Sequence, residues 1–415
     1  MPYITVNEAL ENNRTNSASF VSLNGPWKFH WAENPEMSPK NFHLEKFNDA
    51  AWKNIPVPSN WEMEGYGDPV FRNIAHPFKS NPPFIPRDYN PVGSYRKAFQ
   101  LPAQWKGKQV FLRLEAVTSA FFLWINGKEV GFNKGANEPA EFNITPYLKA
   151  GKNTIAVKVF KYSDGTYLED QDFWRLAGIF RDVFLFTTPD AHIRDYYIST
   201  DLDNDYKDAT LSVNAVLKNY SGTSIQDLSI RMNIFDRNRK SVITTVTSQA
   251  FSVAANNEVE ANISSKVINP AKWSSEKPNL YSLTLELLNK EGKVIEVLST
   301  RFGFKEVEVK NQAILVNGVP VKLNGINSHM QHPTLGHAMD RETIRKDLIL
   351  MKQFNINCVR TSHYPPNLEY LDLADELGIY VVDETGNESH ATEYVSEQKQ
   401  WTDAYINRLR GMGFT

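Results

Sequence analysis

Three short apolar runs between Val321 and His390 constrain the fold of this chain more than any other feature. They are VKLNGINSHMQHP (321–333), NCVRTSHYPP (357–366) and IYVVDETGNESH (379–390), and each of them ends in polar residues. The two segments between these runs have helical periodicity. Strands and helices that alternate at this length indicate successive βα units of a parallel sheet, either closed into a barrel or left open.

The polar residues at the ends of these predicted strands are the main candidates for chemistry, because sites in such folds lie where the strands end. They are His329, His332, His363, Asp383, Glu384, Glu388 and His390. Glu388 and His390 are one residue apart in a loop and can bring an oxygen and a nitrogen ligand to one hard cation. In the alternative interpretation both are solvated loop residues, and His329 and His332 bond solvent or cap a helix.

Helix boundaries in this region follow from single residues. Asp340 is expected to be the N-cap of the first helix. Pro366 is expected in the first turn of the second helix, which Gly378 should end. A third helix is expected within residues 400–412.

Two all-β regions precede the βα units. Alternating apolar residues and the hairpin signal Asn126-Gly127 predict a sandwich of the jelly-roll type over residues 1–188. Few strands, short turn-rich spacers and no helical segment predict a smaller immunoglobulin-like sandwich over residues 189–304. Residues 305–415 contain a further hairpin at Asn317-Gly318 and the three βα units. The proline-rich segment 73–95 is expected to be a long ordered loop.

Charge and cysteine content exclude several classes of function. Lys and Arg total 45 against 48 Asp and Glu, and the net charge of −3 gives no reason to expect nucleic acid or an anionic membrane as partner. The single cysteine, Cys358, excludes an intrachain disulfide and a cysteine-based metal cluster. The N-terminus lacks the features of a signal peptide, and no run is long enough to span a membrane. We expect a cytoplasmic protein, or a periplasmic or secreted one if a signal peptide has been removed.

A second polar cluster lies in YLEDQDFWRLAGIFRDV (167–183), where charged residues are interleaved with large aromatic ones. Buried charges need partners, so Arg175 and Arg181 are expected in a salt-bridged seam between domains. The run Asp170-Gln171-Asp172 is more polar than one seam requires. It suits a hydroxyl-rich ligand.

Together these segments resemble the N-terminal three domains of a family-two glycoside hydrolase, and most closely those of a β-galactosidase. The resemblance covers nearly all of the chain. Besides the three strand ends, it is carried by GPWKF (25–29), VPSNWE (57–62), the proline-rich loop 73–95, DGTYLEDQDFWRLAGIFRDV (164–183), WSSEKPNLY (273–281) and GFKEVEV (303–309).

The resemblance implies a jelly-roll domain, an immunoglobulin-like domain and a (β/α)8 TIM barrel that hydrolyses terminal β-D-galactosides with retention. It implies that the galactosyl group is bound by Asn73, Asp172, His329 and His363. It also implies magnesium at Glu388 and His390, and sodium near Asp172. The expected partner is therefore a β-galactoside, and self-association into a homo-oligomer is left open.

Two departures from the family pattern limit the resemblance. Where the family has Asn-Arg-His-Glu-His-His-Pro, residues 327–333 read NSHMQHP, which removes a cation and a carboxylate and leaves the sugar specificity open. Gly386 to Ser389 spells the Gly-Asn-Glu motif of the family's acid/base, but Glu388 follows the third strand and the family's acid/base follows the fourth. The resemblance thus implies that the acid/base and the nucleophile come from later strands, and that the chain as written is an inactive fragment.

Two alternatives remain at this point. One is a non-catalytic carbohydrate-binding or assembly module, which the missing carboxylates favour. The other is a family-two hydrolase for another β-glycoside, such as a glucuronide or a mannoside.

Overall fold

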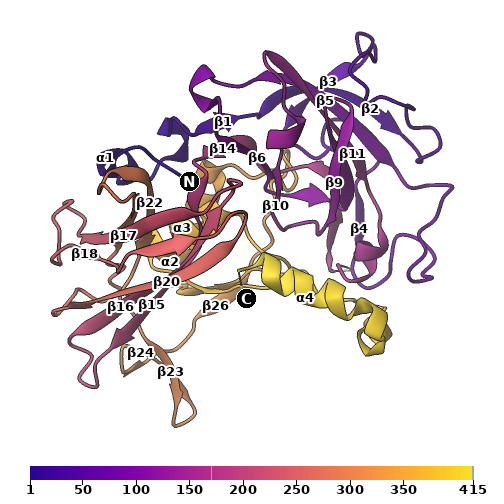
Figure 1. The fold of residues 1–415 in the computed structure, drawn as a ribbon. Helices are drawn as coiled ribbons and strands as arrows, with labels where there is room; N and C mark the ends of the chain where they lie inside the picture. The colour runs from indigo at the N-terminus through magenta and orange to yellow at the C-terminus, as the bar shows by residue number, and fades with distance from the viewer. Residues whose placement is uncertain (170, 414–415) are drawn as a thin grey trace.

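Two antiparallel sandwiches and a short parallel sheet follow one another along the chain (Figure 1). The computed structural model describes residues 1–169 and 171–413. The helix α4 (Thr402–Gly411) lies beside the first sandwich rather than the second (Figure 1). The short helix α1 (Val6–Ala9) precedes the sandwiches. Single 3₁₀ turns occur at Arg14–Asn16, Ala103–Trp105, Thr145–Tyr147, Asp164–Tyr167, Glu393–Glu397 and Lys399–Trp401.

The first sandwich consists of a four-stranded and a six-stranded antiparallel sheet. The smaller sheet has the order β1 (Phe20–Ser22), β14 (Val183–Thr188), β6 (Gln109–Leu114), β10 (Ala140–Asn143). The larger has the order β3 (Lys53–Val57), β2 (Gly25–Ala32), β5 (Val92–Gln100), β11 (Lys152–Phe160), β8 (Ala120–Ile125), β9 (Lys128–Lys134). This confirms the all-β sandwich predicted for this part of the chain.

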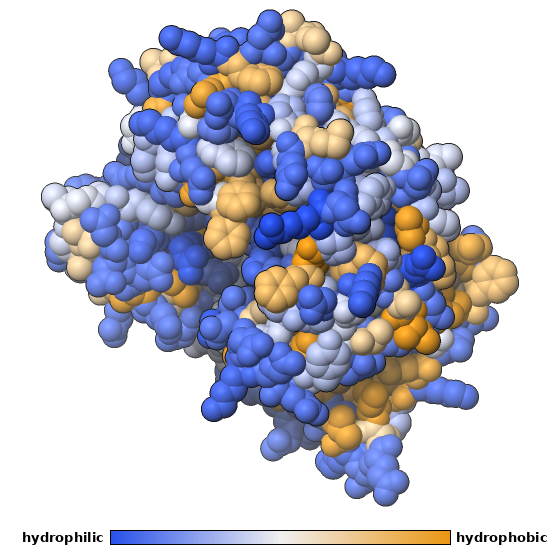
Figure 2. Space-filling view, turned by 90° about the vertical axis from the view of Figure 1, so that its right-hand side faces the viewer, coloured by the Kyte–Doolittle hydropathy of each residue, from blue (hydrophilic) through white to orange (hydrophobic). Residues whose placement is uncertain are grey.

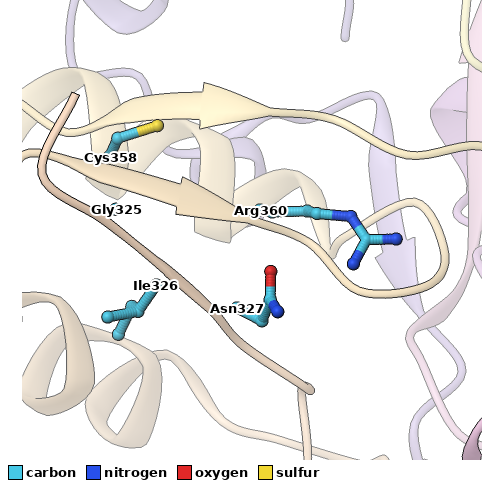
Figure 3. Close-up of a pocket in the computed structure, with 5 residues that line it drawn as sticks. All are labelled: Gly325, Ile326, Asn327, Cys358 and Arg360. Carbon is cyan, nitrogen blue, oxygen red and sulfur yellow. The ribbon is translucent and has the colours of Figure 1, made fainter.

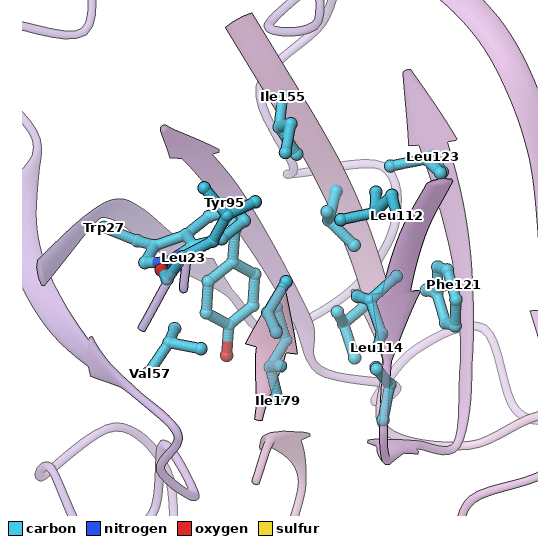
Figure 4. Packing of buried hydrophobic residues seen from close by; sticks show 14 of the residues in the cluster. Leu23, Trp27, Val57, Tyr95, Leu112, Leu114, Phe121, Leu123, Ile155 and Ile179 are labelled. Carbon is cyan, nitrogen blue, oxygen red and sulfur yellow. Dashed lines mark hydrogen bonds between the residues drawn. The ribbon is translucent and has the colours of Figure 1, made fainter. Parts of the chain in front are cut away.

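The core of this sandwich lies between its two sheets. Strand residues alternate between the two faces of a sheet, and the inward set meets in the middle. Figure 4 shows Trp27 and Tyr95 from the larger sheet packed in one cluster with Leu112 and Leu114 from the smaller. Residues 92–95 belong to β5, where Tyr95 is fully buried. The predicted loop 73–95 therefore ends before residue 92.

The predicted hairpins are confirmed. Asn126 and Gly127 have φ angles of 53° and 79° and join β8 to β9. Asn317 and Gly318, with φ angles of 52° and 75°, join β24 (Ala313–Val316) to β25 (Val319–Pro320). Positive φ at both central residues is the geometry that Asn-Gly favours in a two-residue turn. Strand β23 (Val307–Lys310) completes this three-stranded sheet.

The second sandwich is smaller than the first, as the sequence predicts, because each of its two sheets has fewer strands. One sheet has the order β15 (Ala191–Leu202), β16 (Ala209–Asn219), β20 (Glu258–Val267). The other has the order β18 (Val246–Thr247), β17 (Ile225–Phe235), β21 (Tyr281–Leu288), β22 (Val294–Phe302), and β19 (Phe251–Val253) also pairs with β17. Along β16 every second residue is buried, so one face of the strand lines the core.

Three parallel strands follow, in the order β26 (Gly325–Asn327), β27 (Cys358–Arg360), β28 (Tyr380–Val382). The helices α2 (Arg341–Gln353) and α3 (Leu368–Leu377) connect them. Asp340 caps α2 by accepting a hydrogen bond from the Thr343 amide at 2.7 Å, and Gly378 ends α3 with a φ of 76°. Pro366 lies outside the helix, because Asn367 is the N-cap, so its predicted place in the first turn is wrong.

Two small antiparallel ribbons connect the first sandwich to this region. They are β4 (Val70–Arg72) with β12 (Phe173–Arg175), and β7 (Val117–Thr118) with β13 (Gly178–Ile179). Phe173 is buried in the core formed by α2, α3 and β27, where it contacts Tyr364 at a ring-centroid distance of 5.7 Å. Phe173 thus carries the chain of the first sandwich into the core of the parallel sheet, which is separate from the core between the two sheets of the sandwich.

The surface is predominantly hydrophilic. Figure 2 shows one face, on which hydrophobic side chains gather mainly toward the lower right. Among the residues that the structure describes, none of the helices combines the length and the apolar content needed to cross a membrane.

Candidate functional site

The three parallel strands are in register, so the residues that follow them meet at one edge of the sheet. Asn327 lies opposite Arg360, which lies opposite Val382. A hollow of about 410 Å³ lies against β26 and β27, and its lining consists of Gly325, Ile326, Asn327, Cys358 and Arg360. Figure 3 shows Cys358 at the start of its strand and the guanidinium of Arg360 extending from the end. Cys358 is buried, as expected of an inert thiol.

Arg360 connects two side chains at this edge. Its Nη2 donates to Nδ1 of His363 at 3.1 Å and to Oε1 of Glu384 at 2.6 Å. A guanidinium can only donate, so Nδ1 of His363 is the acceptor nitrogen and Nε2 carries the proton. The neutral imidazole therefore presents a hydrogen-bond donor at Nε2.

Glu388 lies between two imidazoles. Its Oε2 is 3.6 Å from Nδ1 of His363, and its Oε1 is 3.8 Å from Nδ1 of His390. The side chains of Glu388 and His390 are each 30% exposed, so both remain open to a ligand. Both distances exceed a hydrogen bond, and neither contact satisfies the carboxylate.

His329 stands against His363. Their ring centroids are 5.4 Å apart and the planes are inclined by 75°. His329 keeps contact with solvent, but desolvation by the surrounding protein, reinforced by His363, lowers its pKa, and Asp172 opposes this shift. Asp172 of the first sandwich is thus close enough to act on a side chain of the parallel sheet.

Asn73 and Asp172 lie at one end of the ribbon β4–β12. Arg72 pairs with Phe173, the last pair of the ribbon, and Asn73 and Asp172 are the next residues beyond it on the two strands. Asn73 is exposed, whereas Oδ1 of Asp172 is buried and has no hydrogen-bond partner in the described part of the chain. The four predicted sugar-binding residues therefore lie on two structural units that meet at this site. Asp170, from the same predicted polar run, lies outside the described residues.

A buried arginine holds the two units together. Arg181 donates to the carbonyl oxygens of Pro365 at 2.8 Å, Pro366 at 3.3 Å and Asn137 at 2.9 Å. Burial lowers the pKa of Arg181 to about 10, so the guanidinium is still charged at neutral pH. The predicted salt-bridged seam is wrong for this residue, because its hydrogen bonds go to carbonyl oxygens rather than to carboxylates. Pro365 and Pro366 directly follow the His363 turn, which Arg181 therefore positions.

The loop that carries Glu388 is also bound to the first sandwich. The amide of Ser389 donates to the carbonyl of Leu168 at 2.9 Å, and the hydroxyl of Thr392 donates to the carbonyl of Tyr167 at 2.9 Å. Further along, Arg408 of α4 donates to Oε1 of Glu169 from Nε at 3.0 Å and from Nη2 at 2.7 Å, with both side chains buried. These contacts fix where Glu388 lies.

Other strand-end residues have local roles. Nδ1 of His332 accepts hydrogen bonds from the amides of Thr334 and Leu335, both at 3.2 Å. These bonds lie within a turn, and Asp340 caps the helix that follows, so the predicted helix-capping role of His332 is wrong. Met330, where the family motif has a carboxylate, is buried in the core beneath the site. Arg360 and Glu384 had no role predicted for them, and only their position at strand ends marked them.

Glu388 and His390 offer an oxygen and a nitrogen donor to a cation, with 3.8 Å between Oε1 and Nδ1. Within residues 1–169 and 171–413, no group of three or more His, Cys, Asp or Glu side chains is arranged to hold a metal ion. Magnesium binds to one or two protein carboxylates and keeps several waters, whereas a structural zinc site needs four protein ligands. The Glu388 carboxylate is compatible with a magnesium ion that keeps most of its waters, and the two residues do not make a structural zinc site.

Comparisons with known proteins place each of the three regions in one family. Residues 20–189 match the sugar binding domain of glycosyl hydrolases family 2, residues 191–305 match a second domain of that family, and residues 307–412 match its TIM barrel domain. The chain is 43% identical to the β-galactosidase of Priestia megaterium over 99% of its own length and 41% of that protein. It is 40% identical to the β-galactosidase of Vibrio cholerae over 94% of its own length and 38% of that protein.

Solved structures show the same fold. The β-glucuronidase 2 of Bacteroides uniformis, covalently bound to an aziridine inhibitor, superposes with a TM-score of 0.74 at 27% identity, over 87% of this chain and 42% of that one. The β-glucuronidase of Bifidobacterium dentium superposes with a TM-score of 0.77 at 23% identity, over 96% of this chain and 66% of that one. The chain thus spans about two fifths of the length of the curated relatives it matches. Three consecutive matches to domains of one family, which together span residues 20–189, 191–305 and 307–412, establish that the chain belongs to glycosyl hydrolases family 2.

Proposed function

We propose that this chain forms the sugar-binding and cation-binding part of a β-galactosidase that releases terminal β-D-galactose with retention. The observation that carries the proposal is that Asp172, from the first sandwich, lies close enough to His329 for its charge to act on that imidazole, and that His329 packs against His363 at the strand ends. The β-galactosidases similar over nearly the whole chain support the choice of sugar.

The chemistry of each side chain suits this role. A sugar presents many hydroxyl groups, which both donate and accept hydrogen bonds. Asp172 offers a buried acceptor oxygen, and His363 offers its Nε2 proton because Arg360 occupies Nδ1. Asn73 and His329 complete the set, and Asp172 is also the proposed neighbour of a sodium ion.

Glu388 and His390 would hold magnesium. A magnesium ion held there would supply positive charge, which can stabilise negative charge that develops during the reaction. Retaining hydrolysis needs two carboxylates about 5–5.5 Å apart. We assign neither role to Glu388, since it lies between His363 and His390, and we propose that other strands of the barrel supply both carboxylates.

Calorimetric titration of the 415-residue chain with galactose and with an aryl β-galactoside tests sugar binding. We expect saturable binding that weakens about tenfold in His363→Ala and is unchanged in the control His43→Ala, which alters a histidine of the first sandwich. Absence of binding to both ligands would contradict the proposal. Turnover of the aryl galactoside that Glu388→Gln abolishes would overturn the assignment of Glu388 as a metal ligand.

A second candidate is a β-glucuronidase, because the two solved structures described above carry that name. Titration with the matching aryl β-glucuronide separates the two candidates. Preference for the glucuronide over the galactoside would replace the proposed sugar and leave the family assignment intact.

A further inference from the structure

Unpaired buried polar atoms gather where the first sandwich meets the loops after β27 and β28. In most native structures such atoms are paired with protein or with ordered water, because an unpaired one costs about 1–3 kcal/mol. In the described part of the chain, the following buried side-chain atoms lack a hydrogen-bond partner: Nε2 and Oε1 of Gln171, Oδ1 of Asp172, Oγ of Ser362, Oε2 of Glu384, Oγ1 of Thr385, Oδ1 of Asn387, Oε2 of Glu388 and Nδ1 of His390.

Gln171 stands out in this group because its whole amide is unpaired. The residue is 0% exposed, and neither amide atom has a hydrogen-bond partner among the residues that the structure describes. A buried leucine or methionine would fill the same volume without this penalty. Packing alone therefore does not explain a glutamine at this position.

The amide of Gln171 faces the loop that carries Glu388. A Cβ atom built on Gly386 would lie 3.7 Å from Nε2 of Gln171. Gly386 is itself buried and precedes Glu388 by two residues. The loop is held in this position by the hydrogen bond from the Ser389 amide to the Leu168 carbonyl at 2.9 Å.

The backbone at Gln171 is fixed as well. Its carbonyl oxygen accepts hydrogen bonds from Nη2 of Arg175 at 2.7 Å and from the amide of Phe173 at 3.0 Å. Phe173 in turn is buried in the core beneath the strands. The direction of the Gln171 side chain is therefore set by the fold rather than chosen by a flexible segment.

We propose that Gln171 is a positioning residue for the divalent cation of Glu388 and His390, acting from the first sandwich through the waters that the cation retains. Magnesium keeps several of its waters, and a primary amide can both accept from such waters and donate to their neighbours. Residues that orient the ligands and waters of a metal commonly change its affinity by 10–100-fold. The inference rests on the proposed cation site and assigns its additional residue.

The test is magnesium binding by the metal-stripped 415-residue chain, measured by calorimetry and by the magnesium-dependent rise in Tm. Gln171→Met keeps the volume and removes the amide, and Gln171→Glu keeps an acceptor oxygen. Thr284→Val is a matched control, because Thr284 is also fully buried with an unpaired hydroxyl but lies in the second sandwich.

We expect Gln171→Met to weaken magnesium binding at least tenfold while its metal-free Tm equals or exceeds that of the unaltered chain. Gln171→Glu should bind magnesium within threefold of the unaltered chain or more tightly, and Thr284→Val should leave the affinity unchanged. If Gln171 had only a structural role, Gln171→Met would instead lower the Tm by the same amount with and without magnesium. That result, or unchanged affinity in Gln171→Met, overturns the proposal.

The same titrations distinguish an error in the proposed cation site from an error in the role of Gln171. If the unaltered chain does not bind magnesium, the cation site is refuted together with the role of Gln171. If the unaltered chain binds and Glu388→Gln does not, but Gln171→Met binds normally, only the role of Gln171 is refuted.

Discussion

Arg360 donates a hydrogen bond to Nδ1 of His363 across 3.1 Å, and this contact decides which imidazole nitrogen carries the proton. The same guanidinium nitrogen binds Glu384, so the arginine is itself held in place. Because Arg360 ends β27 and His363 follows it by three residues, the imidazole is oriented from within its own βα unit.

In Arg360→Leu, the proton of the His363 imidazole should therefore no longer be restricted to Nε2. In the unaltered chain, ring nitrogen shifts of labelled histidine should show His363 with its proton on Nε2, and in the variant both tautomers should be populated. Galactoside affinity should fall about tenfold, since a hydrogen bond to a charged group contributes roughly 1.5–3 kcal/mol. Arg341→Leu, at an exposed position on α2, serves as control. Retention of a single tautomer in Arg360→Leu would contradict the role given to Arg360.

Arg181→Met should loosen the junction between the first sandwich and the parallel sheet. The substitution leaves the carbonyl oxygens of Pro365, Pro366 and Asn137 without this donor. We expect a loss of about 3 kcal/mol in unfolding free energy, because buried acceptors deprived of donors each cost roughly 1 kcal/mol or more. Denaturant unfolding measures this loss, and Arg341→Met should cost less than about 0.5 kcal/mol. Equal effects of the two substitutions would show that the buried hydrogen bonds do not stabilise the junction.

Lys161 and Glu62 form a buried ion pair in the first sandwich, with 2.6 Å between Nζ and Oε1 and exposures of 3% and 0%. Lys161→Met leaves the buried Glu62 carboxylate without its cation and should lower the free energy of unfolding by about 3–5 kcal/mol. Adding Glu62→Gln should recover most of that loss, because glutamine can still accept the hydrogen bond from the Ala177 amide. Unfolding of the two single variants and the double variant completes the cycle. A double variant no more stable than Lys161→Met would rule out the stranded charge as the cause.

Two buried histidines should make the protein sensitive to acid. Burial, reinforced by Arg181, lowers the pKa of His337 to about 3, and burial, reinforced by Arg175, lowers that of His76 to about 4. Both folded-state pKa values lie below the unfolded value of about 6.5. The contribution of the two histidines to the free energy of unfolding is therefore fully present above pH 6.5 and is lost as the pH falls toward 4. Each histidine adds a slope of about 1.4 kcal/mol per pH unit. His337→Phe should remove one of these two contributions between pH 4 and 6, and an unchanged slope would contradict its burial in the neutral form.

Glu138 should make the protein less stable as the pH rises, whereas the two histidines make it less stable as the pH falls. Burial, reinforced by Glu169, raises its pKa to about 8. The folded-state value lies above the unfolded one, so its contribution is complete below pH 4.5 and is lost as the pH rises through 8. Glu138→Gln should equal the unaltered chain in stability at pH 4 and exceed it by a few kcal/mol at pH 9. Thermal unfolding across this range checks the sign, and a destabilised variant at pH 9 would refute it.

Local patterns in the sequence were sufficient for most of the architecture. The Asn-Gly turns, the N-cap Asp340 and the terminating Gly378 depend on φ angles and on hydrogen bonds within four residues, so their chemistry is readable without a structure. Parallel strands end at the same edge, which is why His363 and Glu388 could be expected near each other. Pro366 was misplaced because a proline is compatible with the first helical turn and also with the loop before it.

The order of the elements and the residue types at the strand ends can be read from the amino-acid sequence alone. Which of these residues act together depends on contacts between residues far apart in the chain, and these contacts form only in the folded protein. Arg181 finds the carbonyls of Pro365 and Pro366 rather than a carboxylate, and the amide of Gln171 meets the loop of Gly386. Such pairings depend on how one folded unit docks on another, and no local periodicity encodes that.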